Sequence, residues 1–270
     1  MQIVGIMLVR NEDVFVERVV RNVIAFCDRI HVVDHRSSDR TPVVLRALAA
    51  EFDHLEVRRA RRARVSHELL EPYVGTNTWA LRVDGDEVYD PAGLTLLRRR
   101  LLEGDFRPFF RVQANVLHCV SHDAENGVAS GYLSPPSRPI TALFNLAALD
   151  RWTNAPERLH AGTPEFRDGY GWDAVKPLAD LMSWDESPLR YLHVCFLPRS
   201  SEDGSDERVR RSLGETGLYD RSVRGSLTRT ARGRRLDPLV VEIQARGSNW
   251  KLEKYRRGPL VTKDVSSFLA

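Results

Sequence analysis

Residues 79–87, which read WALRVDGDE, decide how the rest of the chain is interpreted. Trp79, Leu81 and Val83 alternate with other positions, and this period of two predicts a strand that buries at least one face. Three carboxylates follow directly, and Gly85 between them allows a tight turn because glycine has no Cβ. The segment therefore predicts a buried strand that ends in an acidic turn.

This acidic turn favours a site for a divalent cation. Asp84 and Asp86 flank Gly85, and two carboxylates so close repel each other unless a cation lies between them. Mg²⁺ and Mn²⁺ are hard ions that take oxygen ligands. The simpler alternative is an ordinary acidic turn without an ion, because Asp-Gly is common at turns. Both interpretations stay open on these residues alone.

The residues before this segment predict an α/β fold with a mostly parallel sheet. Residues 2–9 and 29–33 are apolar and rich in β-branched side chains, which favours buried strands, and residues 55–57 suggest a third. Apolar residues at helical spacing separate these strands, and the β-α-β-α-β order is typical of a parallel sheet flanked by helices. Loops 10–13 and 34–41 should then reach the same edge as the acidic turn. Routine polar loops of an α/β domain are the alternative.

Patterns in the second half of the chain are weaker. Residues 91–102 predict a helix, and residues 109–118, 140–146 and 191–197 predict strands. Residues 121–139 contain several glycines and prolines without periodicity, which predicts a mobile loop that could act as a lid.

The predicted organisation is one domain with an extension. Residues 1–90 form the first half of the domain and residues 91–200 the second half, which is irregular over much of its length. Residues 201–270 form a helical and basic C-terminal extension, because arginine and glycine are frequent there and apolar residues are sparse.

Composition indicates a soluble globular protein. The chain has 270 residues, of which 42% are hydrophobic and 29% charged, with a net charge of +3. This charge is too near balance to predict a nucleic-acid partner. Cys27, Cys119 and Cys195 lie far apart, which argues against a disulfide framework or a zinc site and favours buried thiols in a reducing compartment. No signal peptide and no apolar run of about 20 residues is visible, so a cytoplasmic location without a membrane span is expected.

Three co-linear motifs resemble those of family 2 glycosyltransferases of the GT-A fold. They are residues 9–12 (VRNE), 32–41 (VVDHRSSDRT) and 79–87, and their order and spacing match as well. The resemblance covers roughly the first 90 residues well and weakens toward residue 200. It implies that residues 1–90 are the nucleotide-binding half of the domain and residues 91–200 the acceptor-side half. It implies a metal-dependent, inverting enzyme that moves a sugar from a nucleotide-diphosphate donor to a small-molecule or glycan acceptor.

The resemblance also implies roles for individual residues. Those that would contact the donor nucleotide are Val9, Arg10, Glu12, Asp34, Arg36, Asp39, His67 and Asp84. Asp84, Asp86 and His193 would hold Mn²⁺ or Mg²⁺, which neutralises the charge of the departing diphosphate. Relatives often carry Arg-Asn upstream of the tryptophan, where this chain has Ser66-His67-Glu68. A buried structural histidine is the alternative for His193.

The general base is harder to identify than the metal ligands. In inverting enzymes a carboxylate takes the proton from the acceptor hydroxyl. Relatives often carry His-Glu near residues 155–160, but here His160 is followed by Ala161. The candidate carboxylates are Glu157, which is preferred, Asp173 and Asp185. Asp86 completes the predicted catalytic set through the metal.

Two other classes of function remain open. A nucleotidyltransferase or a nucleotide-sugar hydrolase would use the same crevice with another nucleophile. A non-catalytic protein would bind a partner through the basic C-terminal region. Metal-dependent binding of one nucleoside diphosphate separates the enzymes from the binding protein.

Overall fold

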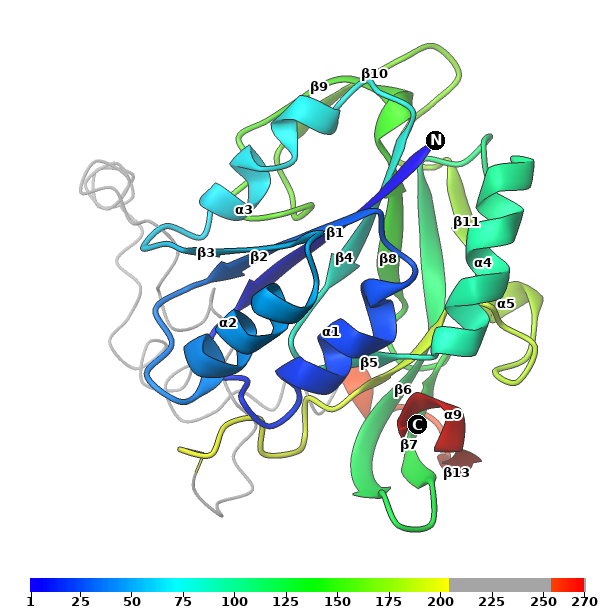
Figure 1. Ribbon diagram of the computed structural model, residues 1–270. Helices are drawn as coiled ribbons and strands as arrows, with labels where there is room; N and C mark the ends of the chain where they lie inside the picture. Colours follow the sequence, from blue (N-terminus) through cyan, green and yellow to red (C-terminus); the bar gives the residue numbers. More distant parts are fainter. Residues whose placement is uncertain (204–253, 270) are drawn as a thin grey trace, which may run out of the picture.

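A computed structural model describes residues 1–203 and 254–269 of the chain. Its centre is an 11-stranded sheet, with helices on both sides (Figure 1). The strands are β1 (Gln2–Val9), β2 (Arg29–Asp34), β3 (Leu55–Arg59), β4 (Thr78–Val83), β5 (Glu87–Tyr89), β6 (Arg111–Asp123), β7 (Val128–Ser134), β8 (Ile140–Asn145), β11 (Val175–Pro177), β12 (Arg190–His193) and β13 (Leu260–Asp264). The prediction of an α/β fold is confirmed.

Helices and a small second sheet cover the central strands. The helices are α1 (Val16–Ile24), α2 (Thr41–Glu51), α3 (Val65–Glu68), α4 (Pro91–Glu103), α5 (Leu178–Leu181) and α9 (Ser266–Leu269), with short 3₁₀ turns η1 (Glu71–Tyr73) and η2 (Leu146–Ala148). The second sheet pairs β9 (Leu149–Thr153) with β10 (Thr163–Phe166). Among the described helices, none has the length and apolar character that crossing a membrane requires.

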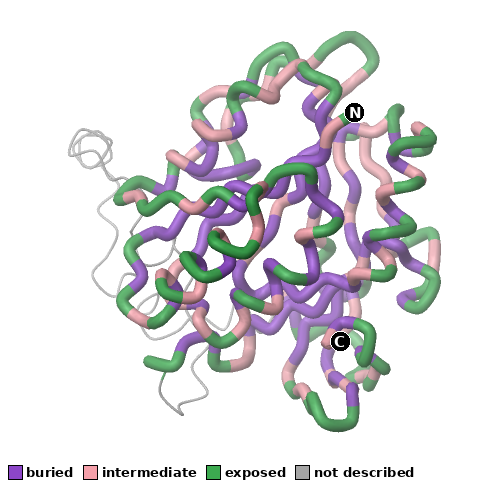
Figure 2. The backbone as a smooth tube through the Cα atoms, viewed as in Figure 1, coloured by how far each residue is buried: buried purple, intermediate pink, exposed green. Residues whose placement is uncertain are grey.

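β1 shows why its sequence is apolar throughout. Ile3 and Met7 pack into the core beneath α1, α2 and α4, whereas Val4 and Ile6 pack into a second core on the opposite face. A strand buried on both faces has no polar side to expose, so it reads as a continuous apolar run. Figure 2 shows this burial along the central strands, while the outer faces of the helices are exposed.

The parallel half of the sheet brings three loops to one edge. Strands β4, β1, β2 and β3 run side by side in parallel, with Val9 beside Asp34 and Met7 beside Val83. The carboxyl ends of β1, β2 and β4 therefore meet, which confirms that loops 10–13 and 34–41 share an edge with the acidic turn. Antiparallel pairings through β8, β6, β7 and β13 extend the sheet beyond β4.

The prediction of a mobile loop at residues 121–139 is wrong. β6 continues to Asp123 and pairs antiparallel with β7, so much of the segment is a hairpin. Two of its glycines are needed by the hairpin itself. Gly127 has φ 63° at the turn, and a Cβ on Gly131 would lie 2.3 Å from the carbonyl oxygen of His118. Glycine is common in loops, but Gly131 lies within a strand and allows the backbones of β6 and β7 to approach closely.

The last described residues pack on the same sheet. β13 pairs with β7, and the Phe268 ring of α9 stacks on Trp184 with ring centroids 5.9 Å apart. The Asn22 side chain donates a hydrogen bond of 2.7 Å to the carbonyl of Phe268. The greater part of the predicted helical and basic extension, residues 204–253, lies outside the described residues.

Candidate functional site

Loops 10–13 and 34–41 are joined by hydrogen bonds into one unit. The Asn11 N–H donates to Ser37 Oγ at 2.9 Å, and the Glu12 N–H donates to Thr41 Oγ1 at 2.7 Å. Asn11 has φ 53°, a left-handed conformation that asparagine tolerates better than most residues. The two loops thus hold a fixed surface at the carboxyl ends of β1 and β2.

The predicted nucleoside contacts lie on this unit. Val9 accepts a hydrogen bond of 2.8 Å from the His35 N–H. Asp34 is buried; its Oδ1 accepts from the Ser37 N–H at 2.9 Å, and its Oδ2 lies 3.4 Å from Arg59 Nε. Of the other members of this set on the loops, Glu12 is buried, Arg10 and Asp39 are half-buried, and Arg36 is exposed.

Residues 198–203 pack across both loops. The Val14 N–H donates to the Arg199 carbonyl at 3.1 Å, and Ser200 Oγ donates to Asp39 at 2.7 Å. Ser201 Oγ donates to Asp13 at 2.6 Å; hydrogen bonds from Ser201 lower the pKa of Asp13, although burial opposes this shift. This contact places the Arg199 side chain inside the site.

Asp84 is held by two arginines. Arg82 Nη1 lies 2.7 Å from Asp84 Oδ2, and Arg158 Nη1 binds Asp84 Oδ1. The Arg82 and Arg158 side chains are 15% and 7% exposed, so water screens these pairs weakly. The negative charge of Asp84 is thereby balanced within the chain.

Asp86 lies deeper, with 4% of its surface exposed. Arg199 Nη1 binds Asp86 Oδ2 and lies 3.5 Å from Glu12 Oε1. His193 Nε2 approaches the same Asp86 oxygen to 3.7 Å. A Cβ on Gly85 would lie 2.7 Å from Glu12 Cγ, so glycine is needed for Glu12 to pack against the turn.

Glu87 supports the turn from inside the protein. Its Oε1 lies 2.6 Å from Arg82 Nη2, and its Oε2 accepts from the Asp84 N–H at 3.0 Å and from the Tyr89 hydroxyl at 3.3 Å. Burial raises the pKa of Glu87 to about 7, against the opposing pull of Arg82. Of the three carboxylates of the turn, Glu87 is the one that anchors it.

The donor atoms of the turn suit a hard divalent ion, but arginines already contact them. Asp86 Oδ2 and His193 Nε2 lie 3.7 Å apart, and two ligands of one ion at about 2.1 Å each are at most about 4.2 Å apart. An ion bound by Asp84 and Asp86 would share them with, or displace, the guanidinium groups of Arg158 and Arg199.

His67 is turned into the protein. Its Nδ1 lies 2.6 Å from the Arg158 carbonyl and its Nε2 lies 3.0 Å from the Trp152 carbonyl, and the residue is 1% exposed. Both ring nitrogens are therefore engaged by backbone. His67 holds the segment that carries Arg158, and the structure does not bring its ring to the open edge.

Two of the three predicted base candidates, Glu157 and Asp185, lie far apart in the fold, and the third, Asp173, is exposed. Glu157 is 4% exposed, and its Oε1 lies 3.0 Å from Arg158 Nη2, so Arg158 links it to Asp84. Asp185 has a side chain that is 69% exposed and pairs with Lys263 at 3.0 Å, near the amino end of β12. The structure brings Glu157 to the acidic turn and leaves Asp185 outside it.

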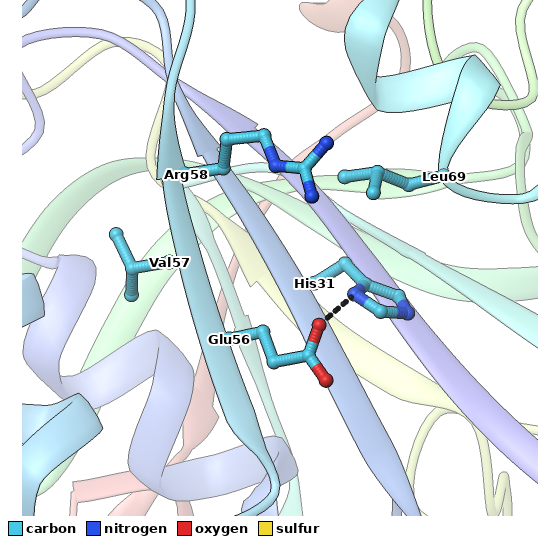
Figure 3. A pocket seen from close by; sticks show the side chains of 5 residues that line it. All are labelled: His31, Glu56, Val57, Arg58 and Leu69. Atoms are coloured by element: carbon cyan, nitrogen blue, oxygen red, sulfur yellow. Dashed lines mark ion pairs between the residues drawn. The ribbon is translucent and has the colours of Figure 1, made fainter.

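A separate cavity of about 260 Å³ lies on the α3 side of β2 and β3 (Figure 3). Its walls include His31, Glu56, Arg58 and Leu69. His31 Nδ1 lies 3.2 Å from Glu56 Oε2 across the strand pair. His31 precedes Asp34 on β2, so the cavity lies behind the loop edge and not at the acidic turn.

Three comparisons relate the chain to known proteins. No family model matches, and no curated protein matches. Among solved structures, TarS 1–349 of S. aureus is 15% identical with a TM-score of 0.32, and the match covers 45% of this chain and 36% of that chain. Glucosyl-3-phosphoglycerate synthase from Mycobacterium tuberculosis, in complex with Mn²⁺, UDP-glucose and phosphoglyceric acid, is 18% identical with a TM-score of 0.33, covering 43% and 44%. The chain spans less than half of either of these structures.

Several site residues were not predicted from the sequence. Arg158 and Arg199 stand far from the acidic turn along the chain, and His118, which contacts His193, lies on β6. A partial signal exists for Arg199, because it follows the predicted strand of His193 within a short polar stretch. Nothing in the local sequence of His118 or Arg158 indicates these contacts.

Proposed function

We propose that the chain is a glycosyltransferase of the GT-A type, which transfers a sugar from a nucleotide-diphosphate donor to an acceptor hydroxyl. The observation that carries the proposal is the meeting of loops 10–13 and 34–41 with the acidic turn at one sheet edge. Ligands of open α/β sheets bind outside the carboxyl ends of the strands. The three motifs that resemble family 2 glycosyltransferases are those that meet at this edge.

The nucleoside would lie on the joined loops. Val9 and Arg10 at the end of β1, and Asp34, Arg36 and Asp39 after β2, offer backbone and side-chain groups for the base and ribose. Because residues 198–203 hydrogen-bond to the same loops, they limit how far the loops can move. The donor would thus meet a preformed surface, which lowers the entropy cost of binding.

The diphosphate would lie against the acidic turn. Asp84 and Asp86 are the proposed ligands of a divalent ion, Mn²⁺ or Mg²⁺, which would neutralise charge on the departing diphosphate. Arg158 and Arg199 are buried beside these carboxylates, and guanidinium groups bind phosphate oxygens well. We expect the diphosphate to compete with the two carboxylates for these arginines.

Glu157 is the proposed general base. It is buried, and Arg158 joins it to Asp84, so it lies near the reacting centre if the diphosphate binds at the turn. A carboxylate that removes the acceptor proton on the face opposite the diphosphate inverts the anomeric carbon. The exposure of Asp185 and its pairing with Lys263 make it the weaker candidate.

Isothermal titration of the full chain with UDP, GDP and dTDP, with and without Mn²⁺, tests the proposal. We expect one nucleoside diphosphate to bind, and to bind more tightly with Mn²⁺. Asp86→Asn should abolish the metal dependence, whereas the exposed Asp185→Asn serves as the matched control and should bind normally. Binding of none of the three would contradict the proposal.

Product analysis then separates the enzyme classes. A glycosyltransferase releases nucleoside diphosphate in proportion to glycosylated acceptor. A hydrolase releases free sugar at full rate without acceptor, and a nucleotidyltransferase releases pyrophosphate from a nucleoside triphosphate and a sugar phosphate. Either of the last two outcomes would replace the proposed reaction with another at the same edge.

A further inference from the structure

A second cluster of metal-binding side chains lies behind Asp86. His118 of β6 and His193 of β12 are register partners in parallel strands, so both side chains point to the same face of the sheet. Cys195 follows His193 by two positions. All three residues are buried, with 0%, 8% and 2% of their surfaces exposed. One ligand atom from each residue lies within 4.8 Å of the other two.

The two histidine rings approach each other through their Nδ1 atoms. His118 Nδ1 lies 2.9 Å from His193 Nδ1. Their Nε2 atoms point the other way: that of His118 lies 3.3 Å from the Arg138 carbonyl, and that of His193 lies 3.7 Å from Asp86 Oδ2. The first partner is a hydrogen-bond acceptor, so His118 Nε2 is placed to donate a proton to it, and the second is a carboxylate at ion-pair distance from His193 Nε2.

A metal ion can take the place of the hydrogen bond between the two rings. If both Nε2 atoms are protonated, two Nδ1 lone pairs face each other at 2.9 Å and repel unless a proton or a metal ion lies between them. Metal-ligating histidines usually donate their other ring N–H to a backbone carbonyl or a carboxylate. His118 has such a bond to the Arg138 carbonyl, and the Asp86 carboxylate lies 3.7 Å from His193 Nε2.

We propose that His118 Nδ1, His193 Nδ1 and Cys195 Sγ form a binding site for a zinc-class ion. Two imidazoles and one thiolate favour Zn²⁺ over the hard ions that suit the acidic turn. The sequence argued against a zinc site because the cysteines are far apart, but the site needs only one of them. In this arrangement His193 binds the second ion through Nδ1, and its Nε2 faces Asp86 at 3.7 Å.

Tyr255 closes this histidine–cysteine cluster. Its ring centroid lies 4.4 Å from that of His118 and 5.1 Å from that of His193. The Ser137 hydroxyl donates to the Tyr255 carbonyl at 2.8 Å and fixes the backbone there. Tyr255 is 8% exposed, so its ring limits the access of water to the ligands.

Titration of the reduced full chain with Co²⁺, as a spectroscopic substitute for Zn²⁺, tests the site. We expect ligand-field absorption of a four-coordinate ion and a thiolate-to-cobalt charge-transfer band, both removed by added Zn²⁺. Cys195→Ser should abolish the charge-transfer band and weaken Zn²⁺ binding by at least about 100-fold, beyond what loss of an outer-shell partner costs. His118→Gln should weaken it comparably.

Cys119→Ser is the matched control. Cys119 is also buried, but it is adjacent to His118 on β6, so its side chain points to the opposite face, and its Sγ lies 3.1 Å from the Ser121 carbonyl. This variant should keep the charge-transfer band. Absence of the band in the unaltered chain, its survival in Cys195→Ser, or its loss in Cys119→Ser would each overturn the proposal.

Two further measurements separate the zinc site from misfolding and from the proposed glycosyl transfer. They are alkylation of the cysteines and binding of a nucleoside diphosphate. Zn²⁺ should slow iodoacetamide labelling of Cys195, located by peptide mass spectrometry, but not that of Cys119; equal labelling with and without Zn²⁺ would contradict the site. Circular dichroism confirms that each variant is folded. Nucleoside diphosphate binding without a cobalt band would refute the zinc site alone, whereas the band without nucleotide binding would refute the glycosyltransferase proposal alone.

Discussion

Two neighbouring clusters at the end of the sheet balance buried charge in opposite ways. In the carboxylate–arginine cluster, acidic and basic side chains pair directly: Asp84, Asp86, Arg82, Arg158 and Arg199. In the histidine–cysteine cluster, His118, His193 and Cys195 bring nitrogen and sulfur ligand atoms together. Asp86 and His193 connect the two across 3.7 Å.

The difference concerns how each cluster would take up an ion. Carboxylates paired with buried guanidinium groups are neutralised without a metal, so their ion competes with arginine. The two facing Nδ1 atoms contact each other, so an ion would displace only the proton between them. We therefore expect the first cluster to bind its ion together with a diphosphate, and the second to bind its ion alone.

Glu157→Gln should have the largest effect on catalysis. Loss of a general base lowers turnover by about 100- to 10,000-fold, while donor affinity and the cobalt spectrum of the histidine–cysteine cluster should not change. Steady-state kinetics with a saturating donor measures the effect. Asp185→Asn is the control and should keep full turnover; an equal loss in both variants would remove Glu157 as the base.

Asp86→Ala should affect stability as well as binding. It leaves the buried guanidinium of Arg199 without this carboxylate, and removing one partner of a buried ion pair costs about 3–5 kcal/mol. Asp86→Asn keeps a hydrogen-bond acceptor and should cost less. Urea unfolding gives the free energies, and titration with nucleoside diphosphate gives the affinities. Unchanged affinity in Mn²⁺ would exclude Asp86 as a ligand of the donor ion.

Gly85→Ala tests the packing of the carboxylate–arginine cluster alone. The new Cβ would lie 2.7 Å from Glu12 Cγ, so Glu12 must move away from Arg199, at a cost of about 1–3 kcal/mol. Adding Glu12→Ala removes the clashing atoms and should restore part of the free energy of unfolding. A double variant as unstable as the sum of the two single variants would show that Glu12 is not the cause.

The smallest expected effect lies away from both clusters, at His31. Burial lowers the pKa of His31 from 6.5, although Glu56 opposes this shift. Below pH 6.5 the unfolded chain therefore takes up a proton that the folded chain resists, so this contribution to stability is present above 6.5 and lost as the pH falls. The slope is at most about 1.4 kcal/mol per pH unit.

His31→Gln provides the measurement of this slope. Urea unfolding at several pH values below neutrality should show a shallower loss of stability in the variant than in the unaltered chain. The cobalt spectrum at neutral pH should be the same in both, because His31 lies on β2 and lines a separate cavity. Identical slopes would show that the proton affinity of His31 is the same in the folded and unfolded chain.

Local patterns predicted the parallel half of the fold well. The β-branched runs at β1 and β2 and the helical spacing between them follow from burial on both faces, and right-handed crossovers then place the loops on one edge. The hairpin of β6 and β7 was not predicted, because a glycine such as Gly131 lies in a strand there and allows the two backbones to approach closely. Local patterns cannot distinguish that use from a loop.

Apolar periodicity and the handedness of the chain were enough to predict the strand that carries the acidic turn, the two polar loops beside it and the edge at which they meet. The side chains that surround the acids became known from the fold. Arg158, Arg199 and His118 reach the cluster from distant segments, and their positions depend on strand register and on residues 198–203 packing over the loops. Contacts between such distant residues leave no periodic pattern in the sequence. The kind of chemistry at this edge was therefore predictable, but the residues that surround the carboxylates were not.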